Sequence, residues 1–478
     1  YFELYNLLSF AITQFLNNNS IFFFVNVAPK HFLFLIILLG GINTSVSSEL
    51  QHWQQAKINW QSEAGSHINI LADEQPAFMA LKPYIPLFEK LTGISVGFHP
   101  LEQSQMRIRR HQDLSEGLGL YDVHPMGITF LGEAQSNGWI EPLAPYLENP
   151  LITDKSWYQL EDISERSLAL CRINGALYSL PFDFSAPIYF YRKDLFTRFN
   201  LKVPDTYAEL LKTKVALQRA IDTDPQLKGM HAFASRTLPG AGLNTWTILP
   251  IMRAYGAQVI NEHGESEFDS PETEDALKMY RNLVTGYGTP DNSRLLHFYE
   301  LRNQFKQGKL ASAFLASHFY NEIDTAEESD IWNKWEAAPL PAGPVARETS
   351  PWAWAFTINA HSNNKTAAWL FIQWATSEQT ASLLSTGGSP PRKKVWQEKL
   401  FTLVNKPGFN NAMLWVFDHA TPDRLQAGMV EFPVIGKVIS YTFSQIFYGA
   451  DIKESIKTTH TKINVDMKQL TSNRAVQQ

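Results

Sequence analysis

The chain has 478 residues, too many for one compact core, and this length predicts two or three domains. Charged residues make up 18% and hydrophobic residues 44%, which excludes a disordered or collagen-like chain, and the net charge of −6 offers no basic field to a nucleic-acid partner. The single cysteine, Cys171, excludes an internal disulfide and a thiolate metal site.

Residues 1–48 differ in composition from the rest of the chain, because they contain only one acidic and one basic side chain. Lys30 and His31 precede the apolar run Phe32–Leu39 and the small-x-small sequence Ser45-Val46-Ser47, which is the layout of a secretory signal peptide. We interpret this stretch as a leader with an upstream extension, and we expect a periplasmic mature chain. An uncleaved anchor is the alternative, although a membrane span needs about 20 apolar residues.

After the leader, short apolar runs alternate with helical patterns. The predicted strands are Ile68–Ala72, Ile94–Phe98 and Tyr121–Val123. The helical region between the first two strands ends at Thr92-Gly93, and Pro83 and Pro86 predict a kink in it. Alternation of strands and helices predicts parallel α/β layers.

Helix starts recur further along the chain. Thr206 and Glu209 form a capping box, and Ser270-Pro271 supplies an N-cap followed by a first-turn proline. Asn363-Asn364 precedes a helix whose predicted apolar stripe is Ala368, Phe371, Ile372 and Ala375. No repeat or long Gly/Ser linker occurs, so we expect short strands to join the two halves.

Motifs for catalysis are absent from the sequence. No G-x-x-x-x-G-K-[ST], H-E-x-x-H or G-x-S-x-G occurs, and the 13 histidines show no metal-ligand spacing. Acidic residues are plentiful, so composition alone leaves a glycosidase carboxylate pair open. We expect a protein that is not an enzyme and that needs no cofactor and no metal.

The order of several motifs is similar to that of a known family. They are TGISVGFHP, YDVHPMGITFLGEAQSNGWIEPLAPYL, LYSLPFDFSAPIYFYRKDLFTRFNLKVPDTYAELL, GAQVIN, FKQGKLASAFLASHFYNEI, APLPAGP, SPWAWAFTINAHSNNKTAAWLFIQWAT and GGSPPRKKVW. Over roughly residues 66–465 the chain resembles the sugar-type extracellular solute-binding proteins of ABC importers, the class that includes maltose-binding protein.

This resemblance implies an α/β fold, the two-lobe periplasmic-binding-protein fold of type II, with lobes joined by hinge crossings. The predicted lobe I is 66–182 plus 338–377, and the predicted lobe II is 184–337 plus 378–470. The predicted hinge crossings lie near 181–185, 338–342 and 377. The ligand is then expected in a cleft between the lobes, which close on it and deliver it to a permease.

The candidate ligand-binding residues follow from strand ends and from the resemblance. Side chains beyond the carboxyl ends of α/β strands face ligands, and indole rings stack on sugars. The set is Glu74, Gln75, Met126, Asp183, Asn244, Trp246, Ser317, His318, Trp352, Trp354 and Arg392, and Asp73 precedes it at the end of the first strand. For these residues the alternatives are helix capping at Glu74 and Gln75, core packing at Met126 and Trp246, and a lobe-stabilising salt bridge at Arg392.

The resulting hypothesis is a monomeric binding protein that captures a sugar or polyol and presents it to an inner-membrane ABC permease. A uronate read by Arg392 is one alternative ligand. A sensing role with a chemoreceptor or sensor kinase is another, and a periplasmic glycan enzyme is a third. Iron capture by paired tyrosines fits less well, because Tyr189 and Tyr191 belong to the predicted crossing strand.

Overall fold

The computed structural model describes residues 46–240, 242–291, 295–384, 388–398, 406–421, 429 and 431–477. The chain divides into two compact units, Tyr1–His52 and Trp53–Gln478, and the fold below is that of the second. Helix α3 (Val46–Gln54) is the first described element, so the predicted signal-peptide core lies outside the described residues. Within the described ranges, no helix combines the length and apolar character that a membrane crossing requires.

The first lobe is built on a five-stranded sheet of order β2-β1-β3-β10-β6. Its strands are β1 (His67–Asp73), β2 (Ser95–Leu101), β3 (Val123–Gly127), β6 (Leu180–Ser185) and β10 (Trp352–Ile358). β1 runs parallel to β2 and β3, whereas β10 is antiparallel to β3 and β6. The three strands predicted before residue 130 are confirmed, with later ends for the second and third.

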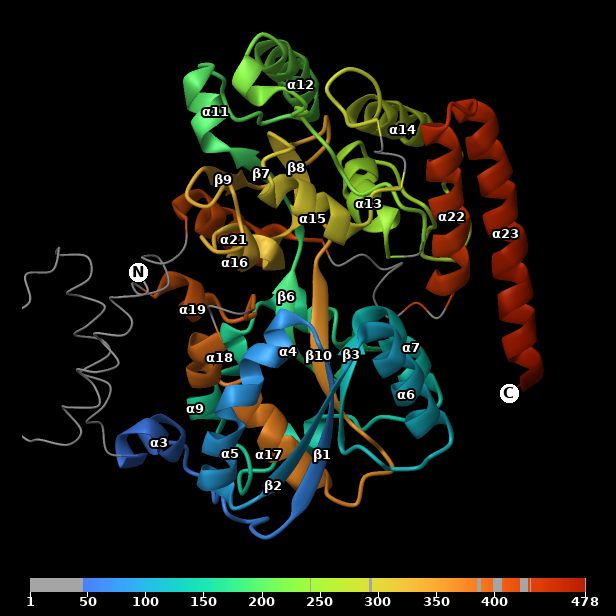
Figure 1. Cartoon of the computed structure of the whole chain (residues 1–478). Helices are drawn as coiled ribbons and strands as arrows, with labels where there is room; N and C mark the ends of the chain where they lie inside the picture. Colours follow the sequence, from blue (N-terminus) through green and yellow to red (C-terminus); the bar gives the residue numbers. More distant parts are fainter. Residues whose placement is uncertain are drawn as a thin grey trace, which may run out of the picture. The chain divides into compact units, whose positions relative to one another are not determined.

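Helices and turns accompany this sheet (Figure 1). They are α4 (Pro76–Leu81), η1 (Lys82–Tyr84), α5 (Ile85–Thr92), α6 (Gln103–Ser115), α7 (Ile128–Ser136), α8 (Ala144–Leu147), α9 (Lys155–Tyr158), η2 (Leu160–Asp162), α10 (Glu165–Ala169), the hairpin β4 (Arg172–Ile173) and β5 (Ala176–Leu177), α17 (Lys365–Ala375) and α18 (Glu378–Leu384). The predicted kink is confirmed, because the 3₁₀ turn at Pro83 separates α4 from α5. Gly93 ends α5 in the left-handed conformation, at φ 72°, which glycine adopts without strain.

The second lobe is built on the antiparallel sheet β8-β7-β9. Its strands are β7 (Pro187–Arg192), β8 (Ser312–Ala316) and β9 (Trp335–Ala338). Its helices and turns are α11 (Lys193–Arg198), α12 (Tyr207–Asp222), η3 (Pro225–Leu227), α13 (Asn244–Ala254), α14 (Pro271–Val284), α15 (Phe298–Lys306), η5 (Ser317–Phe319), α16 (Tyr320–Ile323), α19 (Lys393–Gln397), α21 (Pro407–His419), α22 (Phe432–Phe447) and α23 (Ile452–Gln477). The capping box of α12 is confirmed, and the Ser270 hydroxyl accepts a hydrogen bond from the Thr273 amide at the start of α14.

Two segments, residues 185–187 and 339–351, carry the chain between the two sheets, and we call them the crossing segments. β6 ends at Ser185 and β7 begins at Pro187, so one buried residue, Ala186, separates strands of different lobes. Figure 1 shows this continuous passage from β6 into β7 beside the start of β10. Phe184, Ala186 and Ile188 belong to one hydrophobic cluster, so the passage is held by buried apolar surface.

α17 and α18 follow β10 on either side of the predicted crossing near residue 377. α18 packs against α4 of the first lobe, and α19 packs against α21, which in turn packs against β9 of the second. α17 is buried on all sides rather than along one stripe, because Trp369, Leu370 and Gln373 are buried together with the predicted stripe.

Candidate functional site

The crossing segments are fixed by hydrogen bonds from the second lobe. The Ser317 hydroxyl accepts from the Ala186 amide at 3.2 Å, and the Ser317 amide donates to the Ala186 carbonyl at 3.0 Å. The Thr349 hydroxyl donates to the Pro187 carbonyl at 2.8 Å, and the Trp246 indole donates to the Ser350 carbonyl at 2.9 Å. Ser317, one of the predicted ligand contacts, is fully buried, and its hydroxyl holds the first crossing segment in place.

Asp183 lies on β6 directly before the first crossing. Its carboxylate accepts one hydrogen bond, from the Ser389 amide at 2.8 Å, and the side chain is only 4% exposed. Burial raises the pKa of Asp183 to about 6, and the hydrogen bond from the Ser389 amide opposes this rise because it favours the ionised form. The Phe184 amide donates back to the Ser389 carbonyl at 2.8 Å, so the loop of Ser389 is tied to β6.

A second buried carboxylate, Asp73, ends strand β1. The amides of Gln75 and Gln103 donate to it at 3.0 and 3.3 Å. Burial raises the pKa of Asp73 to about 6, while these hydrogen bonds and the charge of Arg107 favour the ionised form. Glu74 is exposed beside it, and Gln75 is half-buried. The end of β1 thus presents acceptors and donors of the kind that bind hydroxyl groups.

Two indole rings lie over the end of β3. Trp352 and Trp354 have ring centroids 6.2 Å apart and share one face of β10, as the two-residue period predicts. Gly127 permits this approach, since a Cβ there would lie 3.1 Å from the Trp352 ring and 3.5 Å from the Trp354 ring. Trp352 is half-buried and Trp354 is buried, as is Met126, so Trp352 is the ring with an open surface.

The second lobe contributes a buried cation, Arg236. Its guanidinium stacks on Trp246 at 5.0 Å and on Phe298 at 4.8 Å, and it donates to the carbonyls of Gly242 and Leu243 at 3.3 Å each. Burial lowers the pKa of Arg236 to about 9. Among the described residues, Arg236 forms no ion pair with a carboxylate.

His318 is the neutral imidazole of this lobe. Burial, together with the charges of Arg236 and Arg302, lowers its pKa to about 3. Arg302 stacks on Tyr299 at 5.1 Å and on Phe319 at 5.2 Å, which places these rings beside the histidine. A ring surface, a cation and a neutral imidazole therefore lie close together on the second lobe.

Electrostatic contacts connect the two sets of side chains across the lobes. Burial raises the pKa of Tyr299 on the second lobe, and the next contribution is the charge of Asp73 on the first. Burial likewise raises the pKa of Tyr320, and the charge of Asp183 adds to this shift. The Tyr320 hydroxyl donates to the Gly388 carbonyl at 3.4 Å. We call Asp73, Gln75, Asp183, Arg236, His318 and Trp352 the interlobe residues.

Arg392 takes the alternative role that the sequence left open. It is fully buried, and its guanidinium donates to Asp162 at 3.3 Å and to three backbone carbonyls, those of Thr376, Gln159 and Tyr158. Its hydrogen bonds are therefore used to join the loop after α18 to the first lobe. These contacts agree with the lobe-stabilising alternative, and a ligand contact at Arg392 stays a prediction.

Asn244 also differs from the expectation. Its amide donates to the Ser440 carbonyl at 3.1 Å and accepts from the Ser440 hydroxyl at 2.7 Å, and the side chain has no exposed surface. Asn244 therefore ties α13 to α22. Trp246 is 5% exposed, its indole N–H is used for the crossing segment and one ring face is covered by Arg236, which agrees with the core-packing alternative.

Sequence reasoning missed four charged or aromatic side chains that surround these residues. They are Arg107, Arg236, Tyr299 and Arg302. Arg107 lies on α6, which starts just beyond the end of β2, so its position after a strand end was a usable signal. Arg236 offered no signal beyond a turn-rich sequence after it.

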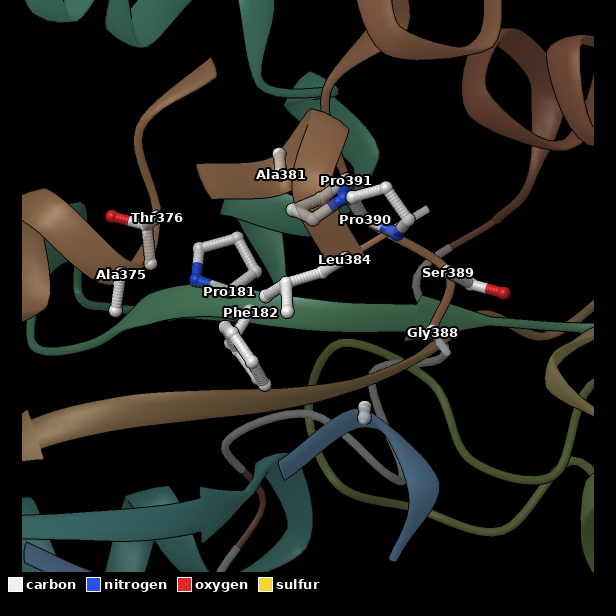
Figure 2. Close-up of a pocket in the computed structure, with 11 residues that line it drawn as sticks. Pro181, Phe182, Ala375, Thr376, Ala381, Leu384, Gly388, Ser389, Pro390 and Pro391 are labelled. Carbon is white, nitrogen blue, oxygen red and sulfur yellow. The ribbon is translucent and has the colours of Figure 1, made fainter. Parts of the chain in front are cut away.

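A small apolar pocket lies beside Asp183 but is not a solute site. Its volume is about 10 Å³, room for one water molecule, and its lining includes Pro181, Phe182, Leu384 and Pro390. Figure 2 shows the Ser389 hydroxyl directed away from these apolar side chains. A larger hollow of about 590 Å³ is lined by α22 and α23 alone. In the part of the chain that the structure describes, no group of three His, Cys, Asp or Glu side chains is placed to hold a metal ion.

Comparison with known proteins identifies relatives over most of the described chain. Residues 72–382 match the family model of bacterial extracellular solute-binding proteins. The erythritol/L-threitol-binding protein of Mycolicibacterium smegmatis is 27% identical over 71% of this chain and 73% of the relative. The mannitol-binding protein of Pseudomonas aeruginosa is 30% identical over 62% of this chain and 65% of the relative.

Solved structures agree with the architecture. An ABC transporter solute-binding protein from Agrobacterium vitis with bound D-mannitol has a TM-score of 0.70 at 23% identity, covering 85% of this chain and 99% of that one. A solute-binding protein from Agrobacterium radiobacter in complex with ribitol has a TM-score of 0.70 at 20% identity, covering 84% and 98%. These likenesses confirm the predicted two-lobe α/β fold.

The match over residues 72–382 of 478 and the shared fold agree with each other and with the order of motifs in the sequence. The chain belongs to the family of bacterial extracellular solute-binding proteins, which is made up of binding proteins rather than enzymes.

Proposed function

We propose that this protein captures a polyol or small sugar between its two lobes. The supporting observation is a set of buried polar atoms without a partner among the described residues: Arg107 Nε on the first lobe, Ser389 Oγ beside the crossing, and His318 Nδ1 on the second lobe. An unpaired buried polar group costs about 1–3 kcal/mol. A solute rich in hydroxyl groups supplies donors and acceptors to all three.

The two buried carboxylates fit the same solute. Asp73 and Asp183 accept hydrogen bonds from hydroxyl groups when ionised, and hydroxyl donors favour the ionised form that burial disfavours. Trp352 offers an open ring face beside them for the C–H side of the ligand. The relatives named for erythritol, L-threitol and mannitol support a short linear polyol as the first class to test.

The proposed lobe boundaries follow the sheets. Lobe I is 66–185 together with 352–384, and lobe II is 187–338 together with 393–398 and 406–477. The pivots are the crossing segments 185–187 and 339–351 and a third connection near Arg392. Closure is driven by the ligand, because only the closed form contacts it from both sides.

Export to the periplasm, a monomeric state and delivery to an inner-membrane ABC permease complete the proposal. The extracellular family assignment supports export. A sensing role uses the same ligand step, so uptake of the solute by cells with and without this chain distinguishes import from sensing.

Isothermal titration calorimetry tests the ligand class. The purified chain is titrated with erythritol, ribitol, mannitol and maltose, and the solute is analysed afterwards by chromatography. We expect one-to-one binding of at least one polyol and recovery of the solute unchanged. Absence of binding across the panel, or chemical turnover of the solute, contradicts the proposal.

A second candidate is an acidic sugar derivative, such as an aldonate or uronate. The observation that favours it is Arg236, a buried guanidinium with no carboxylate in an ion pair among the described residues. Guanidinium groups bind carboxylates bidentately. Titration with gluconate beside mannitol separates the two ligand classes, because the acidic sugar should then bind more tightly than the neutral polyol.

A further inference from the structure

Two histidines lie on one exposed face at the edge of the first-lobe sheet. β1 and β2 pair in parallel, with His67 opposite Ser95, Asn69 opposite Gly97 and Leu71 opposite His99. Paired residues of neighbouring strands point to the same face. His67, Asn69, Gly97 and His99 therefore share one side of the sheet, and both histidines are exposed.

Three ligating atoms from these residues converge above Gly97. A Cβ added at Gly97 would lie 2.4 Å from Asn69 Oδ1, 2.8 Å from His99 Nε2 and 3.4 Å from His67 Nε2. Both Nε2 atoms thus lie within 3.4 Å of one point beside the Gly97 backbone. Because residue 97 has no side chain, these three atoms can approach one another above its backbone.

Hydrogen bonds set the His67 ring in a form that can bind a metal. The Ser95 hydroxyl donates to the Ser66 carbonyl at 3.3 Å, so it accepts from His67 Nδ1 at 2.9 Å. With the proton on Nδ1, the lone pair of His67 is on Nε2, the atom above Gly97. A second hydrogen bond of this kind on the remote nitrogen is typical of metal-binding histidines.

The His99 ring is held on the other side of the same point. Its Nε2 is 2.9 Å from Asn69 Oδ1, and its ring packs edge-on against Tyr121 at 5.5 Å. Rotation of the Asn69 amide frees both His99 Nε2 and the amide oxygen to face a third atom. A cation at this point replaces one hydrogen bond by two coordinate bonds.

We propose that His67, His99 and Asn69 bind one divalent transition-metal ion, with water in the remaining positions. Imidazole nitrogens select Zn²⁺, Cu²⁺ and Ni²⁺ over Mg²⁺ and Ca²⁺. Zinc needs ligand distances of about 2.0–2.2 Å, which small rotations of the exposed histidine rings provide. The histidines are 32 residues apart in the chain and the third donor is an amide, so no sequence spacing signals the site.

This site is separate from the proposed solute site. His67 begins β1 and Asp73 ends it, and seven strand residues span about 20 Å. The ion joins β2, which is the edge strand of the sheet, to its neighbour β1. We therefore expect it to stabilise that edge without changing polyol affinity.

Calorimetric titration of the full chain with Zn²⁺, after treatment with a chelator, tests the proposal. The variants are His67→Ala and His99→Ala, and the control is His263→Ala, an exposed histidine of the second lobe with 73% side-chain exposure. We expect one zinc per chain in the wild type and in the control, and at least tenfold weaker binding in the other two. Zinc binding that is absent from the wild type, or unchanged in both variants, overturns the proposal.

The variant Gly97→Ala tests the geometry while keeping both histidines. Its methyl group would lie within 3.4 Å of all three ligating atoms and push them apart, so we expect loss of zinc binding with unchanged polyol binding. Polyol titration of every variant reports whether the fold is intact. Retained zinc affinity in a folded Gly97→Ala protein contradicts the proposed position, and if this variant does not fold, the two histidine variants decide.

Discussion

At the scale of single residues, the interlobe residues place charge where water is scarce. Asp73 and Asp183 are 2% and 4% exposed, and burial raises the pKa of each to about 6. Both carboxyls therefore titrate near pH 6 in the ligand-free protein, well above the ordinary range of an aspartate. A ligand that donates hydroxyl groups favours the ionised form and lowers these pKa values, which links solute binding near pH 6 to proton release.

This burial predicts a pH dependence of stability. A carboxyl whose folded pKa is raised contributes stability that is full below its unfolded pKa of 3.8 and is lost as pH rises through about 6. A shift of this size corresponds to about 3 kcal/mol for Asp183. We expect the ligand-free Asp183→Asn protein to lose less stability between pH 5 and pH 7.5 than the wild type, as measured by urea unfolding. Equal losses in the two proteins contradict the assignment.

Trp352 is the aromatic side chain that the account assigns to the ligand. Replacing it with alanine removes a stacking surface, and we expect about tenfold weaker polyol binding, or about 1.4 kcal/mol. Trp332→Ala is the matched control, because Trp332 is 46% exposed and lies between α16 and β9. Calorimetry on both variants checks the prediction, and an equal effect of the two substitutions would remove Trp352 from the site.

At the scale of elements, the capping box of α12 gives a local prediction. The Thr206 hydroxyl accepts from the Glu209 amide at 3.2 Å, and the Glu209 carboxylate accepts from the Thr206 amide at 3.2 Å. Thr206→Ala leaves the Glu209 amide without its side-chain partner and should cost about 1 kcal/mol of unfolding free energy. Thr213→Ala within the same helix is the control and should be neutral or slightly stabilising. Urea unfolding of both variants measures the difference, and equal midpoints refute it.

Elements with local signals were predictable from the sequence. β1 shows the apolar run of a buried strand, α12 carries both halves of its cap, and Gly93 supplies the left-handed residue that ends α5. The order of such elements along the chain resembled one family closely enough to predict the fold. These features depend on neighbours within a few residues.

The site was predicted less completely, because its contacts join distant parts of the chain. Asn244 is satisfied by Ser440, which is 196 residues away, and Ser317 by Ala186, 131 residues away. The Arg392 guanidinium donates to the backbone carbonyls of Tyr158 and Gln159, more than 200 residues away. No local pattern announces such partners, so a polar side chain expected at the ligand becomes a tie between elements.

At the scale of the whole molecule, the crossing segments predict a hinge motion. We propose that the short link at Ala186 lets the two sheets rotate as rigid bodies while its flanking strands stay paired. Small-angle X-ray scattering with and without saturating polyol measures this motion. We expect a smaller radius of gyration with the ligand, and an unchanged value would show that binding does not close the lobes.

The most direct test of solute capture between the lobes is a crystal structure grown with the tightest-binding polyol of the titration panel. The account predicts solute density between the lobes, within hydrogen-bond distance of Asp73 or Asp183 on one side and of Arg236 or His318 on the other. Solute density found only elsewhere, for example in the hollow between α22 and α23, with the interlobe residues untouched, would contradict it.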